Sequence, residues 1–401
     1  MDYFVLLASL LVFTGFLLIP LSRRLGAPIL LVVLAVGMLS GEDGPGQIHF
    51  DSFNAAYALG SVALAIILYG GGVETRVSQV RSARIPAMLL ASLGVLVTAF
   101  IVGGAAWWIF DLSLLDGLLL GSVVASTDAA ATFLLIRQNR IGLRPRLENT
   151  LILESGLNDP MAIFLTVALT SLIGMEGDLS FRAVIEYLPM LALQFGLGGL
   201  FGWVGGRGLA MVLNKLNMSP GTYPAMALAG ALAVFAGTSL LGGSGFLAIY
   251  LVGLIMRDNL REDLADRVIG FSEAMQWLSQ IALFLMLGLL VTPHDLPSVA
   301  LGAALIAAVL FFIARPVAVF SCLSGLGFSL REKVFVSWVG LRGAVPIFLA
   351  ILPVISPGPV NVVFFNIVFV IVVFSLIVQG WTIALTAGWL GVIQTDPDNA
   401  D

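Results

Sequence analysis

Two carboxylates lie five positions apart in the apolar segment Leu151-Ile-Leu-Glu-Ser-Gly-Leu-Asn-Asp-Pro160. On a helix, Ser155 and Asp159 share one face because they are four positions apart, and Glu154 and Asn158 share the neighbouring face. The hydroxyl and carboxylate of the first face are hard oxygen ligands of the kind that alkali cations take. The spacing therefore predicts a cation site centred on Asp159, with no metal other than an alkali ion.

A second polar group interrupts an apolar segment upstream, where Ser126, Thr127 and Asp128 follow one another. Serine and threonine can satisfy backbone groups that an interrupted helix leaves free, and a carboxylate there can face a cavity. We predict that Asp128 takes part in the site or shapes it. The alternative is a structural, well-paired Asp128.

Arg315 lies inside the apolar run Phe311-Phe-Ile-Ala-Arg-Pro-Val-Ala-Val-Phe320. A buried guanidinium needs a carboxylate, and a planar pair is the stable solution. We predict a structural ion pair between Glu154 and Arg315.

Arg342 is bracketed by glycines and followed by Pro346 in Val339-Gly-Leu-Arg-Gly-Ala-Val-Pro346, which predicts a broken helix. Where two broken helices cross, Asp128 and Arg342 are expected to compensate the dipoles of the half-helices. The alternative is a kink from which Arg342 extends to the membrane surface.

Glu74 is a weaker candidate at the inner end of an apolar segment, after Gly70-Gly-Gly-Val. It either lines a cytoplasmic funnel or is an ordinary charge at the membrane surface.

The composition requires a membrane around these residues. Of 401 residues, 59% are apolar and 11% charged, against roughly 25% charged in globular chains. The net charge of −5 provides no basic surface for nucleic acid. One cysteine and two histidines provide neither an internal disulfide nor a zinc site, and we predict no cofactor.

Apolar segments of about 20 residues predict an all-α polytopic membrane protein with about 13 transmembrane helices. The expected spans are 3–21, 28–40, 54–72, 85–110, 114–136, 149–174, 183–206, 222–241, 244–256, 268–291, 297–324, 334–354 and 361–391. The first is interpreted as a retained helix, because no basic region or cleavage pattern marks a signal peptide.

Basic residues predict the orientation. If the N-terminus is periplasmic and the C-terminus cytoplasmic, sixteen of the nineteen lysines and arginines fall in cytoplasmic loops. Arg182 falls in a loop on the periplasmic side, and Arg315 and Arg342 belong to the membrane core.

Weak self-similarity predicts two inverted repeats. Residues 28–37 resemble 246–253, and 64–70 resemble 281–288, an offset of about seven spans. An odd offset gives six-helix units of opposite orientation, as in secondary transporters. We expect repeats at 1–174 and 222–393, a linker helix at 175–221 and a cytoplasmic tail at 394–401.

Four motifs together resemble the bacterial NhaP-type monovalent cation/proton antiporters, and more distantly the animal sodium/proton exchangers. They are Ser126-Thr-Asp-Ala129, Glu154-Ser-Gly-Leu-Asn-Asp-Pro160, Val339-Gly-Leu-Arg-Gly-Ala-Val-Pro346 and Val378-Gln-Gly-Trp-Thr-Ile383. Within the group, the chain looks closest to the potassium/proton branch named for cell-volume regulation. The resemblance implies an NhaA-like antiporter fold.

The same resemblance implies a homodimer, with a core from helices 4–6 and 11–13 and a dimerisation region from helices 1–3 and 8–10. It makes Asp159 the carboxylate that binds cation and proton in turn, with Asn158 as its amide partner. Ser155 and Thr127 become further ligands, and Asp128 an indirect contact. Ala129 stands where many relatives have proline, a departure at this break.

The sequence therefore predicts exchange of K⁺, with Na⁺ as the alternative, for H⁺ across a bacterial inner membrane by alternating access. Because position 158 is a neutral amide, we expect electroneutral exchange. One rival is a cation channel. A hydrolase using Ser155 or Ser126 is disfavoured because no histidine lies in the membrane, and an organic-anion symporter because both membrane arginines are already committed.

Overall fold

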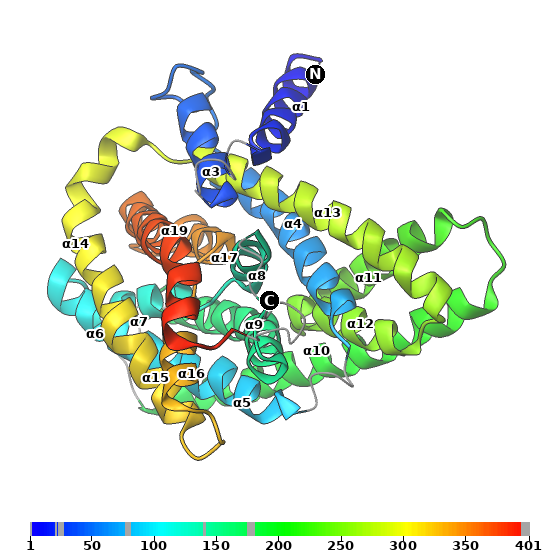
Figure 1. Cartoon of the computed structure of the whole chain (residues 1–401). Coiled ribbons are helices and arrows are strands. Elements are labelled where there is room, and N and C mark those ends of the chain that lie inside the picture. The colour runs from blue at the N-terminus through cyan, green and yellow to red at the C-terminus, as the bar shows by residue number, and fades with distance from the viewer. Residues whose placement is uncertain are drawn as a thin grey trace, which may run out of the picture. The chain divides into compact units, whose positions relative to one another are not determined.

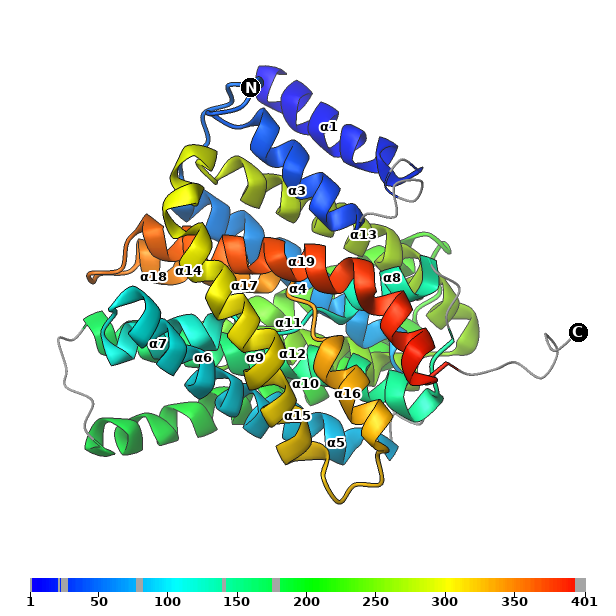
Figure 2. The same cartoon turned by 60° about the vertical axis from the view of Figure 1, so that its left-hand side comes forward.

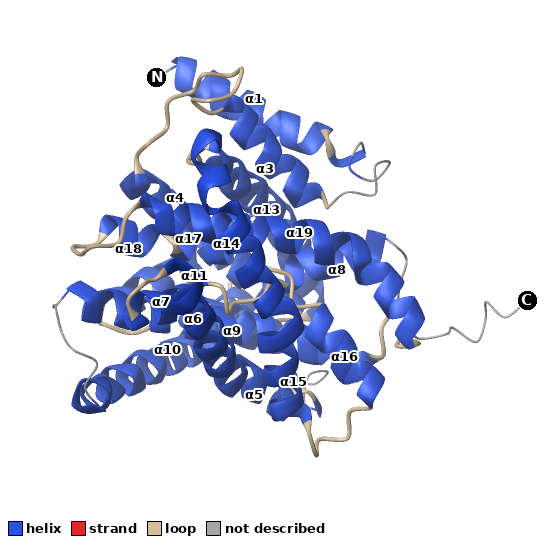
Figure 3. Ribbon diagram, turned by 90° about the vertical axis from the view of Figure 1, so that its left-hand side faces the viewer, coloured by secondary structure: helices blue, strands red, loops and turns tan. Residues whose placement is uncertain are grey.

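The computed structural model describes residues 2–20, 22, 28–76, 82–138, 142–174 and 181–393. Over these residues the regular structure is helical and no strand is present (Figure 3), so the all-α prediction is confirmed for them. The expected tail at 394–401 and the start of the expected linker at 175–180 lie outside the described residues. Helices are the expected solution, because a bilayer offers the backbone no hydrogen-bond partner.

The helices of the first half, coloured blue to green in Figure 1, follow the apolar segments closely. They are α1 (Asp2–Leu17), α3 (Ile29–Ser40), α4 (Phe53–Glu74), α5 (Arg84–Leu89), the π-helical turn η2 (Leu90–Gly94), α6 (Val95–Phe110), α7 (Leu114–Val123), α8 (Ala129–Gln138), α9 (Pro145–Gly174) and α10 (Phe181–Lys215).

The second half contains a similar series. It comprises α11 (Thr222–Leu240), α12 (Gly245–Asn259), α13 (Glu262–Leu289), the 3-10 turn η3 (Pro293–Asp295), α14 (Leu296–Val309), the π-helical turn η4 (Leu310–Ala314), α15 (Arg315–Leu323), α16 (Leu330–Trp338), α17 (Ala344–Leu349), α18 (Ile351–Ile355) and α19 (Val362–Leu390). Figure 2 shows α14, η4 and α15 as one helical run, and α14 packs against α19.

Within the described residues, eight helical segments are long and apolar enough to cross a membrane. Four shorter apolar helices accompany them, at Val5–Leu17, Ile29–Ser40, Leu114–Val123 and Ala344–Ile355. Leu114–Val123 lies within the expected span 114–136, and Ala344–Ile355 ends one residue beyond the expected span 334–354. These spans are interrupted at 124–128 and 339–343. The helix expected at 183–206 continues to Lys215, and the guanidinium of Arg207 lies 4.4 Å from the ring centre of Trp203.

The chain divides into two compact units. The first comprises Met1–Tyr57, Ala83–Glu176 and Phe284–Asp401, and the second comprises Ala58–Ser82 and Gly177–Leu283. Every helix expected for the core domain belongs to the first unit, together with α1 and α3. The division into inverted repeats stays a prediction.

Glycines bring α6 and α7 into close contact within the first unit. A methyl group added at Gly121 would lie 2.2 Å from the carbonyl oxygen of Ala99, and one at Gly117 would lie 2.5 Å from that of Gly103. Small residues allow this backbone-to-backbone packing of membrane helices. The contact fixes α7 just before the break that carries Ser126 to Asp128.

Candidate functional site

Two interrupted helices meet in the first unit through their backbones. The chain leaves helical geometry after Val123 and resumes at Ala129, and does so again between Trp338 and Ala344. The backbone N–H of Asp128 donates to the carbonyl oxygen of Leu341 at 2.8 Å. One break thus satisfies a backbone group of the other, as buried backbone requires.

Asp128 caps the helix that follows the first break. Its Oδ1 accepts a hydrogen bond from the backbone N–H of Ala131 at 2.9 Å, the bond expected of an N-cap aspartate. Its Oδ2 lies against Gly343, where an added methyl group would come within 1.8 Å of that oxygen. The carboxylate therefore occupies the space that a side chain at position 343 would need.

Arg342 covers the end of the helix before the first break. Its Nη1 donates to the carbonyl oxygens of Ala125 and Ser126, at 2.7 and 2.6 Å. These carbonyls follow the C-terminal end of α7, where the helix dipole favours a cation. Arg342 is 1% exposed, which excludes the alternative of a side chain that extends to the membrane surface.

The polar residues of α9 face the first break. The hydroxyl of Ser155 donates to the carbonyl oxygen of Thr127 at 2.6 Å, and Nδ2 of Asn158 donates to the hydroxyl of Thr127 at 2.6 Å. The buried Oδ1 of Asn158 accepts no protein hydrogen bond. That oxygen is therefore available to a cation or a water molecule.

Asp159 is buried, and its Oδ1 accepts a short hydrogen bond from the hydroxyl of Ser126. Its helical neighbours toward the N-terminus are Asn158 and Ser155, both of which contact Thr127. The structure therefore brings Asp159, Asn158, Ser155 and Thr127 to one place, whereas the Asp128 carboxylate caps α8 and lies against Gly343. Carboxylate, amide and hydroxyl oxygens of this kind suit a hard monovalent cation, and among the described residues no group of three His, Cys, Asp or Glu offers a site of another type.

Arg315 and Glu154 form a buried ion pair, with 2.5 Å between Nη1 and Oε1. The second oxygen of Glu154 and the Nε and Nη2 atoms of Arg315 have no protein hydrogen-bond partner, so the contact is a single bond and not the expected bidentate pair. A methyl group at Gly340 would lie 2.8 Å from Nε of Arg315. The pair connects α9 with α15 beside the second break.

Glu74 belongs to the second unit, at the end of α4. Its side chain is exposed, and its Oε1 accepts a hydrogen bond from Nε2 of Gln276 at 2.7 Å. A role in a cytoplasmic funnel stays a prediction.

Several features of the site escaped the sequence reasoning. The sequence predicts no partner for the Ser126 hydroxyl, shows Gln379 only as part of a motif, and does not single out Ser375. It also missed the π-helical turns η2 and η4, of which η4 ends directly before Arg315. Each lies in an apolar run without a distinguishing signal, although π turns are frequent at functional sites.

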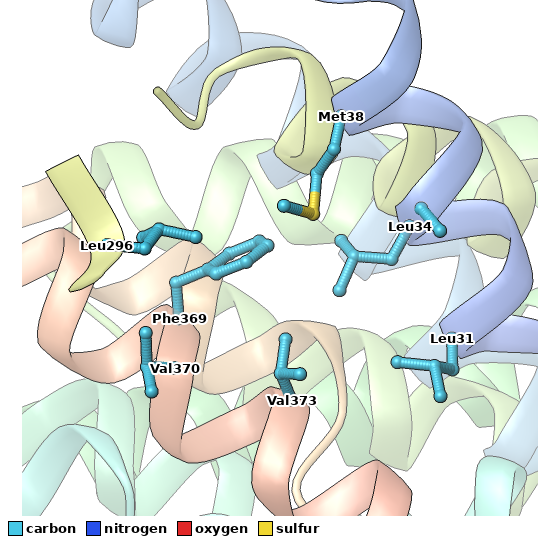
Figure 4. Close-up of a pocket in the computed structure, with 8 residues that line it drawn as sticks. Leu31, Leu34, Met38, Leu296, Phe369, Val370 and Val373 are labelled. Carbon is cyan, nitrogen blue, oxygen red and sulfur yellow. The ribbon is translucent and has the colours of Figure 1, made fainter. Parts of the chain in front are cut away.

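An apolar cavity of about 220 Å³ lies elsewhere in the first unit, between α3, α14 and α19. Figure 4 shows Leu34, Met38, Leu296 and Phe369 around it. Since its lining side chains carry no oxygen ligand, it does not qualify as a cation site.

Comparison with known proteins assigns the chain to a family. Residues 9–389 match the model of the transmembrane region of sodium/hydrogen exchangers. The chain therefore belongs to the sodium/hydrogen exchanger family, whose members are transporters and not enzymes. The predicted resemblance to monovalent cation/proton antiporters is confirmed, and the chain is a multi-pass membrane protein.

Individual relatives agree with this assignment. The chain is 44% identical to the K⁺/H⁺ antiporter NhaP2 of Shewanella baltica, over 98% of this chain and 68% of the relative. It is 45% identical to the K⁺/H⁺ antiporter NhaP of Alkalimonas amylolytica, over 92% and 64%. The structure of the sodium/proton antiporter MjNhaP1 from Methanocaldococcus jannaschii has the same fold, with a TM-score of 0.84 and 23% identity over 98% of this chain and all of that one.

Proposed function

We propose that this chain exchanges a monovalent alkali cation for H⁺ by alternating access, with K⁺ preferred to Na⁺. The observation that carries the proposal is the buried Asp159 carboxylate, hydrogen-bonded to Ser126 in the first break, with the unpartnered amide oxygen of the preceding residue, Asn158, whose Nδ2 binds Thr127 in the same break. The preference for K⁺ is supported by the K⁺/H⁺ antiporters at 44–45% identity.

In this proposal, the cation and the proton compete for Asp159. When the carboxylate is ionised, it binds the cation together with oxygens from Asn158, Ser155 and Thr127. When it is protonated, the cation loses its counter-charge and leaves. Because the two ligands exclude each other at one carboxylate, the fluxes are coupled without contact between cation and proton.

Asp128, Arg342, Glu154 and Arg315 serve as the frame of the site in this proposal. Asp128 and Arg342 compensate the half-helix ends at the crossing, and the Glu154–Arg315 pair connects α9 to α15. Neither arginine is required to touch the transported cation.

We further propose a bacterial inner-membrane location, a periplasmic N-terminus and a cytoplasmic C-terminus. Support comes from the sixteen of nineteen basic residues that fall between expected spans, in the connections that would then be cytoplasmic. Thirteen crossings in two inverted six-helix repeats, an NhaA-like arrangement and a homodimer complete the proposal. The two interrupted segments, seven expected spans apart, support the repeats.

The test is cation-induced dequenching of a pH dye in proteoliposomes, comparing K⁺, Na⁺, Li⁺ and Rb⁺ at several pH values. We expect proton flux with every cation that the site accepts, and the lowest half-saturating concentration for K⁺. Cation flux that is indifferent to an imposed pH gradient would contradict exchange and favour a passive channel.

A further inference from the structure

The hydrogen bonds around Arg342 continue into α19. The backbone N–H of Arg342 donates to the hydroxyl of Ser375 at 2.9 Å, and that hydroxyl donates to Oε1 of Gln379 at 2.6 Å. Nε2 of Gln379 then donates to the carbonyl oxygen of Trp338 at 2.7 Å. Because Trp338 is the last residue of α16, this amide satisfies a carbonyl that has lost its intrahelical partner.

On its other side, Arg342 leads to the cation site. Its guanidinium binds the carbonyl oxygens of Ala125 and Ser126, and the hydroxyl of Ser126 donates to Asp159. Hydrogen bonds on both sides of Arg342 and Ser126, connected through the covalent structure of these two residues, thus link Gln379 to Asp159.

Ser375 and Gln379 are 0% and 1% exposed, so bulk water does not solvate either side chain. They lie four positions apart and hence on one face of α19. Loss of one buried bond in such a series leaves its former partner unsatisfied and weakens the fixed position of the next group.

We propose that Ser375 and Gln379 are positioning residues of the cation site. They hold the second break in the conformation in which Arg342 fixes the carbonyls of residues 125 and 126, and so aim the Ser126 hydroxyl at Asp159. The inference rests on the proposed function of Asp159. Neither side chain contacts Asp159, so they set the affinity for the cation and leave the transport step intact.

The first test measures exchange by three variants in proteoliposomes. Ser375→Ala removes the hydroxyl, Ser375→Thr keeps it, and Thr386→Val removes a hydroxyl on the same helix that bonds only to the carbonyl of Thr382. We expect Ser375→Ala to raise the half-saturating cation concentration about 3- to 10-fold, with the maximal rate within about twofold of wild type.

The pH profile should move as well. When the cation binds more weakly, the proton competes more successfully, and the Ser375→Ala profile shifts to higher pH. Ser375→Thr should restore the wild-type half-saturating cation concentration and the wild-type pH profile. Thr386→Val should leave both unchanged. An unchanged half-saturating concentration in Ser375→Ala, or an equal rise in Thr386→Val, overturns the proposal.

Hydrogen–deuterium exchange gives a measurement that does not depend on transport. Ser375→Ala and Gln379→Leu should speed amide exchange in residues 339–343 and also in residues 124–128, and Thr386→Val in neither. Faster exchange confined to 339–343 would mean that the series stops at Arg342 and would overturn the proposal. A wild-type protein without cation-dependent proton flux would contradict the proposed function instead, and amide exchange would still decide the linkage.

Discussion

The carboxylate of Asp128 lies against the α-carbon of Gly343, and a methyl group at that carbon would come within 1.8 Å of Oδ2. Space therefore requires glycine there, because the Asp128 carboxylate occupies the position that a β-carbon would take. The two broken helices approach as closely as they do because one of them has no side chain at this position.

Gly343→Ala should therefore displace Asp128 from the N-terminus of α8. The lost cap alone costs about 1 kcal/mol, and we expect a lower melting temperature together with reduced exchange in proteoliposomes. Gly104→Ala is the control, because nothing lies within 4 Å of a methyl group added there. Wild-type melting and exchange in Gly343→Ala would show that the break can open at no cost.

Asp159→Asn should abolish cation-dependent proton flux, because an amide side chain neither takes up and releases a proton nor balances the charge of a cation. The fold should persist, since the new side chain still offers an oxygen to the Ser126 hydroxyl. The measurement is dye dequenching beside a melting curve. Ser126→Ala, which keeps the carboxylate, serves as the comparison and should retain exchange with weaker cation binding; proton-coupled flux in Asp159→Asn would refute the assignment.

The Glu154–Arg315 pair should behave as a buried ion pair. Glu154→Gln and Arg315→Gln should each destabilise the protein by about 3–5 kcal/mol, because each leaves an uncompensated charge among buried groups. The double variant should lose less than the sum of the two. Denaturation of all three variants checks this, and strict additivity would mean that the two groups do not interact.

The matched comparison is the exposed pair Arg76–Glu262, whose atoms lie 3.5 Å apart on the surface of the second unit. The same double-variant cycle there should yield about 0–1 kcal/mol. A coupling as large as that of the buried pair would show that burial is not what makes the Glu154–Arg315 contact matter.

A pH-dependent contact lies in the loop after α3. Asp43 accepts hydrogen bonds from the backbone N–H and the imidazole of His294, which hold the pKa of the carboxyl below its ordinary value. A lowered pKa stabilises the fold above the ordinary value of about 4, and this contribution is lost as the pH falls through the lowered pKa. Asp43→Asn should therefore melt at a lower temperature than wild type at pH 6.

The difference in melting temperature should stay constant from pH 6 to pH 5 and shrink below about pH 4. Asp51→Asn, in the same loop, controls for the loss of a loop charge. A difference that grows as the pH falls below 4 would contradict the sign of the pKa shift.

Electroneutral exchange predicts no steady current. With one carboxylate, Asp159, beside a neutral Asn158, one proton replaces one cation in each cycle. Rapid K⁺ or Na⁺ concentration jumps on proteoliposomes adsorbed to a supported membrane should give no signal above that of Asp159→Asn. A sustained current in the wild type alone would require a second proton site.

The sequence predicted the breaks and the residues around them because these carry local signals. Glycines flank Arg342, three polar residues interrupt the segment before α8, and the four-residue spacing of Ser155 and Asp159 can be counted. The partners of Ser126, Ser375 and Gln379 depend on how α9, which carries Asp159, and α19, which carries Ser375 and Gln379, are rotated about their axes. Long, uniformly apolar helices carry no periodic pattern from which that rotation can be deduced.

The ion pair illustrates the same limit. Its partners followed from the rule that a buried charge needs an opposite one. Of the three membrane carboxylates, Asp128 and Asp159 were already assigned to the cation site, which left Glu154 for Arg315. Its geometry did not follow, because the π-helical turn η4 changes the helical phase directly before Arg315. The apolar residues Leu310 to Ala314 give no sign of that change.

Arg342 binds main-chain carbonyls, and every amino acid carries the same carbonyl. Ala125 can therefore be exchanged for another residue of similar size without removing an acceptor from the arginine. Evolutionary constraint on this contact falls on the identity of residue 342 and on the path of the backbone. Residue 125 is therefore free to change within the volume that its neighbours allow, whereas residue 126 is also held by the bond from its hydroxyl to Asp159.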